Sequence, residues 1–84
     1  MVTVLYFARL REALGTATEE VALPDGVRDL DGLRRMLTGR GGAWSAELAA
    51  SKPVRAAVNQ DVARGDTRMA DGDEIAFFPP VTGG

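Results

Sequence analysis

The residues best suited to chemistry in this chain are its last eight, Phe-Phe-Pro-Pro-Val-Thr-Gly-Gly. Two aromatic residues precede two prolines, which lack a backbone N–H donor and therefore end a strand. The sequence then finishes on Gly83 and Gly84, whose missing side chains leave the terminal carboxylate unobstructed. A free α-carboxylate has a pKa of about 3.3 to 3.7 and is a poor nucleophile and acyl donor until another protein activates it. The sequence therefore predicts a carrier whose reactive group is its own C-terminus.

The composition removes most other chemistry from the chain. None of its 84 residues is cysteine or histidine, which excludes disulfides, thiolate nucleophiles, imidazole bases and the usual zinc sites. Ten basic and twelve acidic residues give a net charge of −2, which argues against a nucleic-acid partner. No apolar run approaches the ~18 residues of a membrane span. We expect one domain, no metal, no stably bound cofactor, no membrane contact and a cytoplasmic location.

The spacing of apolar residues and the positions of glycine and proline predict the secondary structure. Asp29 is expected to cap a helix in which Leu30, Leu33, Met36 and Leu37 form one apolar stripe. Alternating apolar and polar residues, with β-branched residues among them, indicate the strands, and glycine or proline marks where the other elements end. Helices are expected at residues 9 to 14, 29 to 38 and 43 to 50, and strands at residues 2 to 8, 17 to 23, 54 to 58, 61 to 64 and 74 to 78.

The order of these elements indicates the fold. The helix at residues 29 to 38 supplies the crossover that a parallel pairing of the first and last strands needs. We therefore predict an α+β, ubiquitin-like β-grasp fold, a mixed sheet of four to five strands packed on one main helix. Residues 1 to 79 form the expected domain, and residues 80 to 84 a flexible tail. A ferredoxin-like fold is the alternative, although it requires a second full-length helix.

The last strand is expected to divide its side chains between two faces. Ile75 and Phe77 should join the core formed by Val2, Val4, Tyr6, Leu33 and Leu37. Phe78 then faces outward beside Phe7 and Leu5, with Val62 completing an apolar patch. Such a patch next to the tail predicts a partner interface, because interfaces favour large aromatic residues. Ordinary surface hydrophobicity is the alternative interpretation.

The prolines and glycines that follow have both a simple and a functional interpretation. Pro79 and Pro80 end the strand, and they also stiffen the exit of the tail. Five extended residues, from 80 to 84, reach at most ~17 Å into a partner. The two glycines could instead be a frayed end with no role. The ordered strand and the prolines before them favour the functional interpretation.

Several segments together resemble the small subunit of molybdopterin synthase, a ubiquitin-like sulfur carrier. The similarity runs from the first strand to the last residue. It is carried by Val4 to Ala8 with Arg11, Glu12 and Gly15, by Val58-Asn59-Gln60, by Asp71-Gly72-Asp73-Glu74 and above all by residues 76 to 84. Departures lie in the middle of the chain, around residues 39 to 42 and Trp44, away from the expected chemistry.

The resemblance implies a complete sulfur-transfer role. An activating enzyme consumes ATP to adenylate Gly84, and sulfur from a persulfide donor then replaces AMP to give a thiocarboxylate. Pro80, Val81, Thr82 and Gly83 thread into the active site of the large synthase subunit, where Gly84 gives its sulfur to cyclic pyranopterin monophosphate. Phe7, Val62 and Phe78 form the interface, in a heterotetramer of two small and two large subunits. The chain is then a sulfur-donor subunit of a sulfurtransferase and no enzyme on its own.

Three other functions remain open at this point. The chain could carry sulfur for thiamine synthesis or for tRNA thiolation, which uses the same C-terminal chemistry. It could be a ubiquitin-like modifier joined to lysines through Gly84, or an interaction module with an inert tail. Complementation, isopeptide adducts and deletion of the two glycines respectively distinguish these functions.

Overall fold

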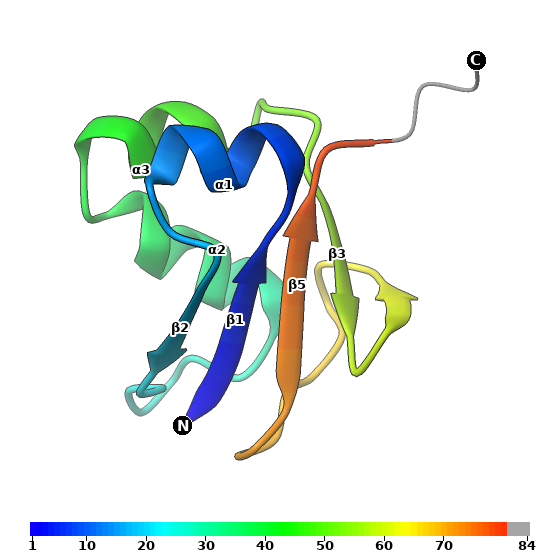
Figure 1. Cartoon of the computed structure of the whole chain (residues 1–84). Helices are drawn as coiled ribbons and strands as arrows, with labels where there is room; N and C mark the ends of the chain where they lie inside the picture. The colour runs from blue at the N-terminus through cyan, green and yellow to red at the C-terminus, as the bar shows by residue number, and fades with distance from the viewer. Residues whose placement is uncertain (81–84) are drawn as a thin grey trace.

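A mixed five-stranded sheet with three helices makes up the fold of residues 1 to 80, which are the residues that the computed structural model describes (Figure 1). The parallel pair β1 and β5 lies at the centre of the strand order β2-β1-β5-β3-β4, and all other pairs are antiparallel. The elements are β1 (Val2–Tyr6), α1 (Ala8–Leu14), β2 (Thr18–Val21), α2 (Leu30–Thr38), α3 (Gly42–Leu48), β3 (Arg55–Val58), β4 (Asp61–Ala63) and β5 (Glu74–Phe78).

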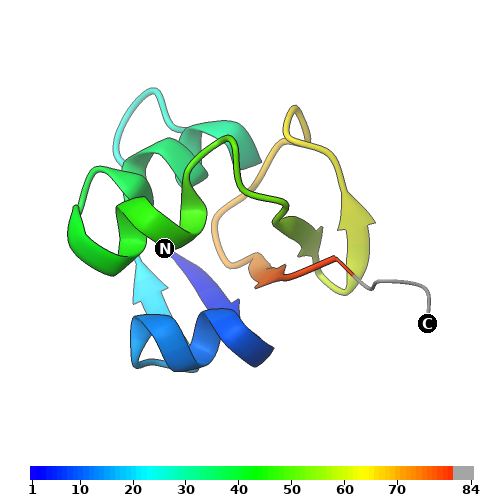
Figure 2. The same ribbon diagram turned by 90° about the horizontal axis from the view of Figure 1, so that it is seen from above.

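The predicted α+β class, mixed sheet and parallel central pair are confirmed. The expectation that the sheet packs on one main helix is incomplete, because α1 and α3 form a second helical contact beside α2. Viewed from above, α2 and α3 lie on one side of the sheet, and no helix covers the other face of β5, β3 and β4 (Figure 2). None of the helices in residues 1 to 80 has the length and apolar character needed to cross a lipid bilayer.

The core confirms the predicted division of side chains between two faces. Ile75 and Phe77 are at most 1% exposed, as are the five core residues expected from the other elements: Val2, Val4, Tyr6, Leu33 and Leu37. Tyr6 and Phe77, on the neighbouring strands β1 and β5, stack with their ring centroids 6.3 Å apart. Phe78, the next residue, therefore faces the other side of the sheet.

A side-chain cap starts α2 as the sequence predicted. The Asp29 carboxylate accepts a hydrogen bond from the Gly32 backbone N–H at 2.8 Å, which satisfies one of the free donors of the first turn. A Cβ added at Gly32 would lie 3.1 Å from that carboxylate oxygen and 3.5 Å from Val27 Cγ1. Glycine thus allows the cap and the preceding loop to lie close to the helix, which offsets its low helix propensity.

A two-residue turn between β3 and β4 fixes the start of β5. Asn59 and Gln60 have φ angles of 50° and 74°, the left-handed values that a type I′ hairpin turn requires. The Asn59 side chain donates to Asp73 Oδ1 at 3.0 Å and accepts from the Glu74 backbone N–H at 3.0 Å. The register of the strand that leads to the tail is therefore held by a side chain from a distant turn.

Candidate functional site

The predicted tail is only partly within the described residues. β5 ends at Phe78, and Pro79 and Pro80 follow it in partly buried positions. Val81, Thr82, Gly83 and Gly84 lie outside the described residues. Their roles in threading and in acyl chemistry therefore stay predictions, as does the domain boundary at residue 79. The described site is the surface from which this segment leaves the sheet.

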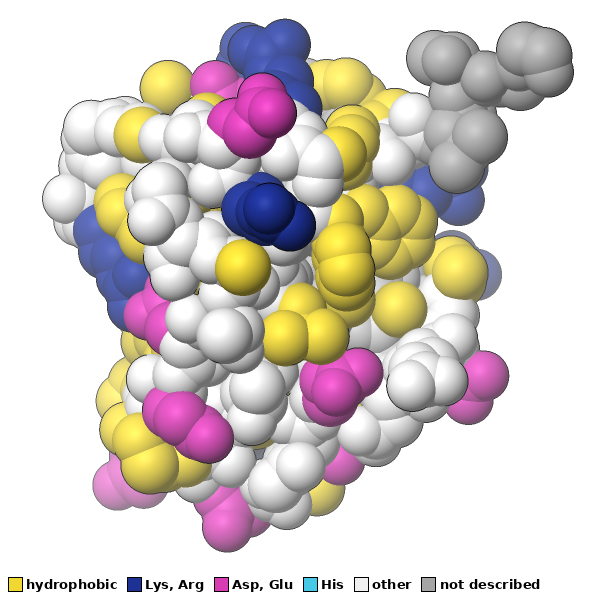
Figure 3. Space-filling model, in the orientation of Figure 1, with side chains coloured by type: hydrophobic (Ala, Val, Ile, Leu, Met, Phe, Trp, Pro, Cys, Tyr) yellow, Lys and Arg dark blue, Asp and Glu magenta, His cyan; other side chains and the backbone are white. Residues whose placement is uncertain are grey.

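The register of the sheet defines an apolar patch on its uncovered face. Leu5, Ala76, Ala57 and Val62 are successive cross-strand neighbours and form one row across four strands. We call this row, together with Phe7 and Phe78 at the level of the tail, the open-face patch. The side chains of the two alanines are shorter than those of their neighbours in the row. Ala57 is only 6% exposed because the larger side chains around it shield it from solvent. In Figure 3 the hydrophobic side chains gather beside the point where the chain leaves the sheet.

The three predicted interface residues all lie on this face. Phe7 is 48% exposed and Val62 is 69% exposed, whereas Phe78 is partly buried between neighbouring strands. The Phe7 backbone N–H donates to the Phe77 carbonyl at 3.1 Å. This bond fixes the backbone of Phe7 relative to the end of β5, where Phe78 lies. Sequence reasoning missed the two alanines of the row, since small residues give no interface signal by themselves. The role of the patch in partner binding stays a prediction.

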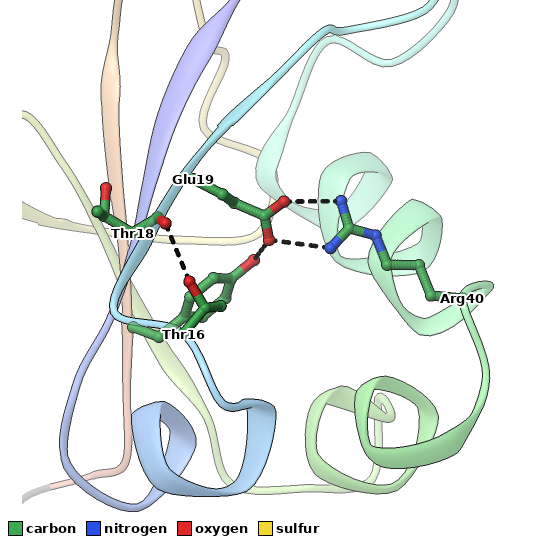
Figure 4. A network of polar contacts seen from close by, with 5 residues as sticks. Thr16, Thr18, Glu19 and Arg40 are labelled. Atoms are coloured by element: carbon green, nitrogen blue, oxygen red, sulfur yellow. Dashed lines mark hydrogen bonds and ion pairs between the residues drawn. The ribbon is translucent and has the colours of Figure 1, made fainter.

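A polar network ties β1 and β2 to the helices on the covered face (Figure 4). Glu19 accepts two hydrogen bonds from the Arg40 guanidinium, at 2.9 and 3.0 Å, and one from the Tyr6 hydroxyl at 2.8 Å. The Arg40 guanidinium also lies 4.4 Å from the ring centroid of Trp44, which contacts Tyr6 edge to face. Because Tyr6 stacks on Phe77, this network braces β1 and β5, the central two of the four strands that carry the open-face patch.

Three pKa values in the network are displaced, and the hydrogen bonds to Glu19 raise that of the Arg40 guanidinium. Burial raises the pKa of the Tyr6 phenol far above its usual range, and its hydrogen bond to Glu19 adds to the effect. The hydrogen bonds from Arg40 lower the pKa of Glu19, and this effect outweighs the partial burial of that carboxyl group. Tyr6 is therefore neutral and Glu19 ionised at neutral pH.

Replacing Glu19 with glutamine is expected to lower stability at pH 7 by about 1 kcal/mol, a value reduced for solvent screening at the partly exposed Arg40. A folded-state pKa below the unfolded value stabilises the protein fully above the unfolded pKa, near 4.5, and this stabilisation is lost as pH falls through the folded pKa. Urea unfolding at pH 7, 4 and 3 should therefore show the two proteins converging. Glu12→Gln, at an exposed position of α1, is the matched control and should show no such trend.

A comparison with protein families identifies the group to which this sequence is related. The family model described as the ThiS family matches residues 4 to 84, which is nearly the whole chain. The chain belongs to the ThiS family. In Escherichia coli K12, the molybdopterin synthase sulfur carrier subunit is 43% identical over 84 residues, and the alignment covers 100% of both chains.

Solved structures of similar sequence share the fold. A Pyrococcus furiosus protein, provisionally assigned as molybdopterin converting factor subunit 1, is 34% identical with a TM-score of 0.78, over 95% of this chain and 97% of the other. The small archaeal modifier protein 1 of Methanosarcina acetivorans is 30% identical with a TM-score of 0.71, over 99% and 95% of the two chains. The ubiquitin-like β-grasp prediction is thus confirmed, and the relatives include both a sulfur carrier and a protein modifier.

Proposed function

We propose that this chain is the sulfur-carrier subunit of a molybdopterin synthase. The observation that carries the proposal is the full-length match to a relative of that name, at 43% identity over 84 residues. The Phe-Phe-Pro-Pro-Val-Thr-Gly-Gly ending supplies the group on which sulfur travels, and the open-face patch beside it supplies a surface for the subunit that receives the tail. ATP-dependent loading is consistent with a cytoplasmic location.

Loading requires that an external enzyme activate the terminal carboxylate. One carboxylate oxygen of Gly84 attacks the α-phosphate of ATP, which gives an acyl adenylate and releases pyrophosphate. The terminal sulfur of a donor persulfide then attacks the acyl carbon and expels AMP, and a thiol cleaves the resulting S–S bond to leave the thiocarboxylate. The chain holds no stably bound cofactor in this scheme, because ATP and the persulfide belong to its partners.

Transfer takes place in the active site of the large subunit. The thiocarboxylate sulfur attacks an electrophilic carbon of cyclic pyranopterin monophosphate and displaces the oxygen substituent on that carbon. Water then cleaves the acyl–sulfur bond, which leaves sulfur on the pterin and regenerates the Gly84 carboxylate. General acids and bases must come from the large subunit, since this chain has no histidine or cysteine. A dithiolene needs two sulfurs, so each product requires two loaded carriers, in keeping with two small and two large subunits per assembly.

Reconstitution tests this function directly. The loaded chain and the large subunit, mixed with cyclic pyranopterin monophosphate, should form molybdopterin with up to one sulfur delivered per carrier. The unloaded chain is the matched control and should form none. Restored molybdoenzyme activity in a carrier-deficient strain, without restored thiamine synthesis or tRNA thiolation, separates the proposal from the two other sulfur pathways. Failure of the loaded chain to yield molybdopterin contradicts the proposal.

Protein modification is a second candidate, favoured by the similarity to a small archaeal modifier protein. The same acyl adenylate could pass to a lysine amine of a target protein and form an isopeptide bond through Gly84. Mass spectrometry of cellular proteins after tryptic digestion decides this point. Lysines that carry the C-terminal residues of this chain support a modifier, and their absence in cells that make molybdopterin restricts the chain to sulfur transfer.

A further inference from the structure

A groove beside the two prolines has no role in the sulfur chemistry described above. Its volume is about 170 Å³, and its lining combines five apolar residues with three charged ones: Leu10, Pro53, Val54, Pro79 and Pro80 with Arg9, Glu47 and Lys52. Sites for small ligands usually have about 300 to 1,000 Å³. This groove therefore suits a side chain of a partner protein better than a substrate or cofactor.

Cationic side chains from three different elements lie near Phe78 and the two prolines. Arg9 of α1 and Lys52 of the α3–β3 connection line the groove, and Arg55 of β3 is the cross-strand neighbour of Phe78. We call Arg9, Lys52 and Arg55 the basic collar. Glu47 lies at 3.2 Å from Arg9 and is the one acidic residue lining the groove. Lys52 and Arg55 are exposed and form no side-chain ion pair with any residue from 1 to 80.

The connection that carries Lys52 is held in place by a partly buried side chain, Arg34. The Arg34 guanidinium donates hydrogen bonds to three backbone carbonyls, those of Leu48 at 2.7 Å, Ala49 at 2.6 Å and Lys52 at 2.8 Å. Desolvation lowers the pKa of Arg34, so these carbonyls replace much of its lost hydration. The backbone at Lys52 is thus preorganised, although the segment between α3 and β3 has no regular secondary structure.

The collar stands out because the protein as a whole is acidic, with a net charge of −2. Acidic side chains gather at the opposite end of the sheet, in the lower half of Figure 3, where β1 and β5 begin. On the open face, Glu20 and Glu74 flank Thr3 in one cross-strand row at that end. The uncovered face therefore runs from negative, through the open-face patch, to positive at the root of the tail.

We propose that the basic collar docks an acidic rim around the channel of the large subunit, with one carboxylate of that rim seated over the groove between Arg9 and Lys52. The inference rests on the proposed function and names the chemistry of its partner surface. Three cations on an acidic protein are too few for a nucleic-acid surface.

Charges at the border of an interface act chiefly on the rate of association. Complementary potentials steer two proteins into register before the apolar surfaces meet, whereas like charges oppose the approach. Salt weakens this steering, since the Debye length falls from about 10 Å at 0.1 M to about 3 Å at 1 M. The collar should therefore orient the domain so that its positive end, and with it the tail, reaches the channel first.

The test is the association rate constant of the chain with the large subunit, measured by stopped-flow fluorescence at 50 and 500 mM NaCl. Lys52→Glu and Arg55→Glu are each expected to slow association about 10-fold at low salt and less than about threefold at high salt. Arg28→Glu is the matched control, because Arg28 is exposed and its carbonyl bonds to Met69 near the start of β5, away from the tail. It should change the rate by less than about twofold.

Circular dichroism of each variant confirms that it is folded before its rate is compared. The proposed docking role of the basic collar is contradicted if both collar variants associate at 50 mM NaCl as fast as the Arg28→Glu control. In that outcome the wild-type complex still forms, so the proposed function stands. Failure of the wild-type chain to bind the large subunit at either salt concentration overturns the proposed function, and this inference with it.

Discussion

A single residue added after Gly84 is expected to abolish sulfur transfer and to leave the fold intact. The extension converts the terminal carboxylate into a peptide amide, which an adenylating enzyme cannot activate. It also moves the new carboxylate one residue beyond the position that the proposed active-site channel of the large subunit would accept. The last strand residue is Phe78 and the core lies entirely before it, so the added residue removes no packing. Molybdopterin formation should fall to background, with the urea unfolding midpoint unchanged.

The control for this experiment restores the original end. An extended chain that a specific protease trims back to Gly84 should regain full activity, which excludes damage to the domain during preparation. Deletion of Gly83 and Gly84 should match the extended chain in both activity and stability. Sulfur transfer by the untrimmed extended chain contradicts the assignment of the reactive group.

Phe78→Ala is expected to weaken binding to the large subunit by about 2 kcal/mol, or roughly 30-fold in Kd. Phe78 belongs to the open-face patch, is the cross-strand neighbour of Arg55 and directly precedes the two prolines. Its neighbour Phe77 carries the core packing, so removal of the Phe78 ring should affect binding more than folding. Isothermal titration calorimetry with the large subunit measures the change.

Thr18→Ala on β2 is the matched control for Phe78→Ala. Thr18 is exposed on the same face of the sheet, paired with Leu5, but lies away from the root of the tail. Its truncation should change Kd by less than about twofold. If the affinity of the Phe78→Ala variant equals that of the Thr18→Ala control, the interface lies elsewhere on the domain.

Local signals explain which parts of the fold the sequence predicts. The Asp29 cap and the period of two in β5 each act within a few residues, and the structure has both. The same period places Phe77 in the core and Phe78 on the open face. The ThiS family match was predictable because residues 76 to 84 combine strand, prolines and glycines in one distinctive order.

Contacts between distant residues explain what the sequence did not predict. Glu19 and Arg40 are 21 residues apart, and nothing in their spacing indicates that both meet the Tyr6 hydroxyl. The hydrogen bonds of Asn59 to β5 and of Arg34 to three backbone carbonyls also form only in the folded protein. They depend on how strands and helices pack together. The basic collar appears only when α1, β3 and the α3–β3 connection come together near Phe78 and the two prolines.

The most direct test of the central claim is mass spectrometry of the intact chain and of its C-terminal peptide after incubation with the activating enzyme, ATP and a persulfide donor. We expect a gain equal to the replacement of one oxygen atom by sulfur, localised to Gly84, and its loss after the large subunit and cyclic pyranopterin monophosphate are added. A chain that stays unmodified, or that carries sulfur at any other residue, contradicts the claim that the C-terminal carboxyl group is the sulfur carrier.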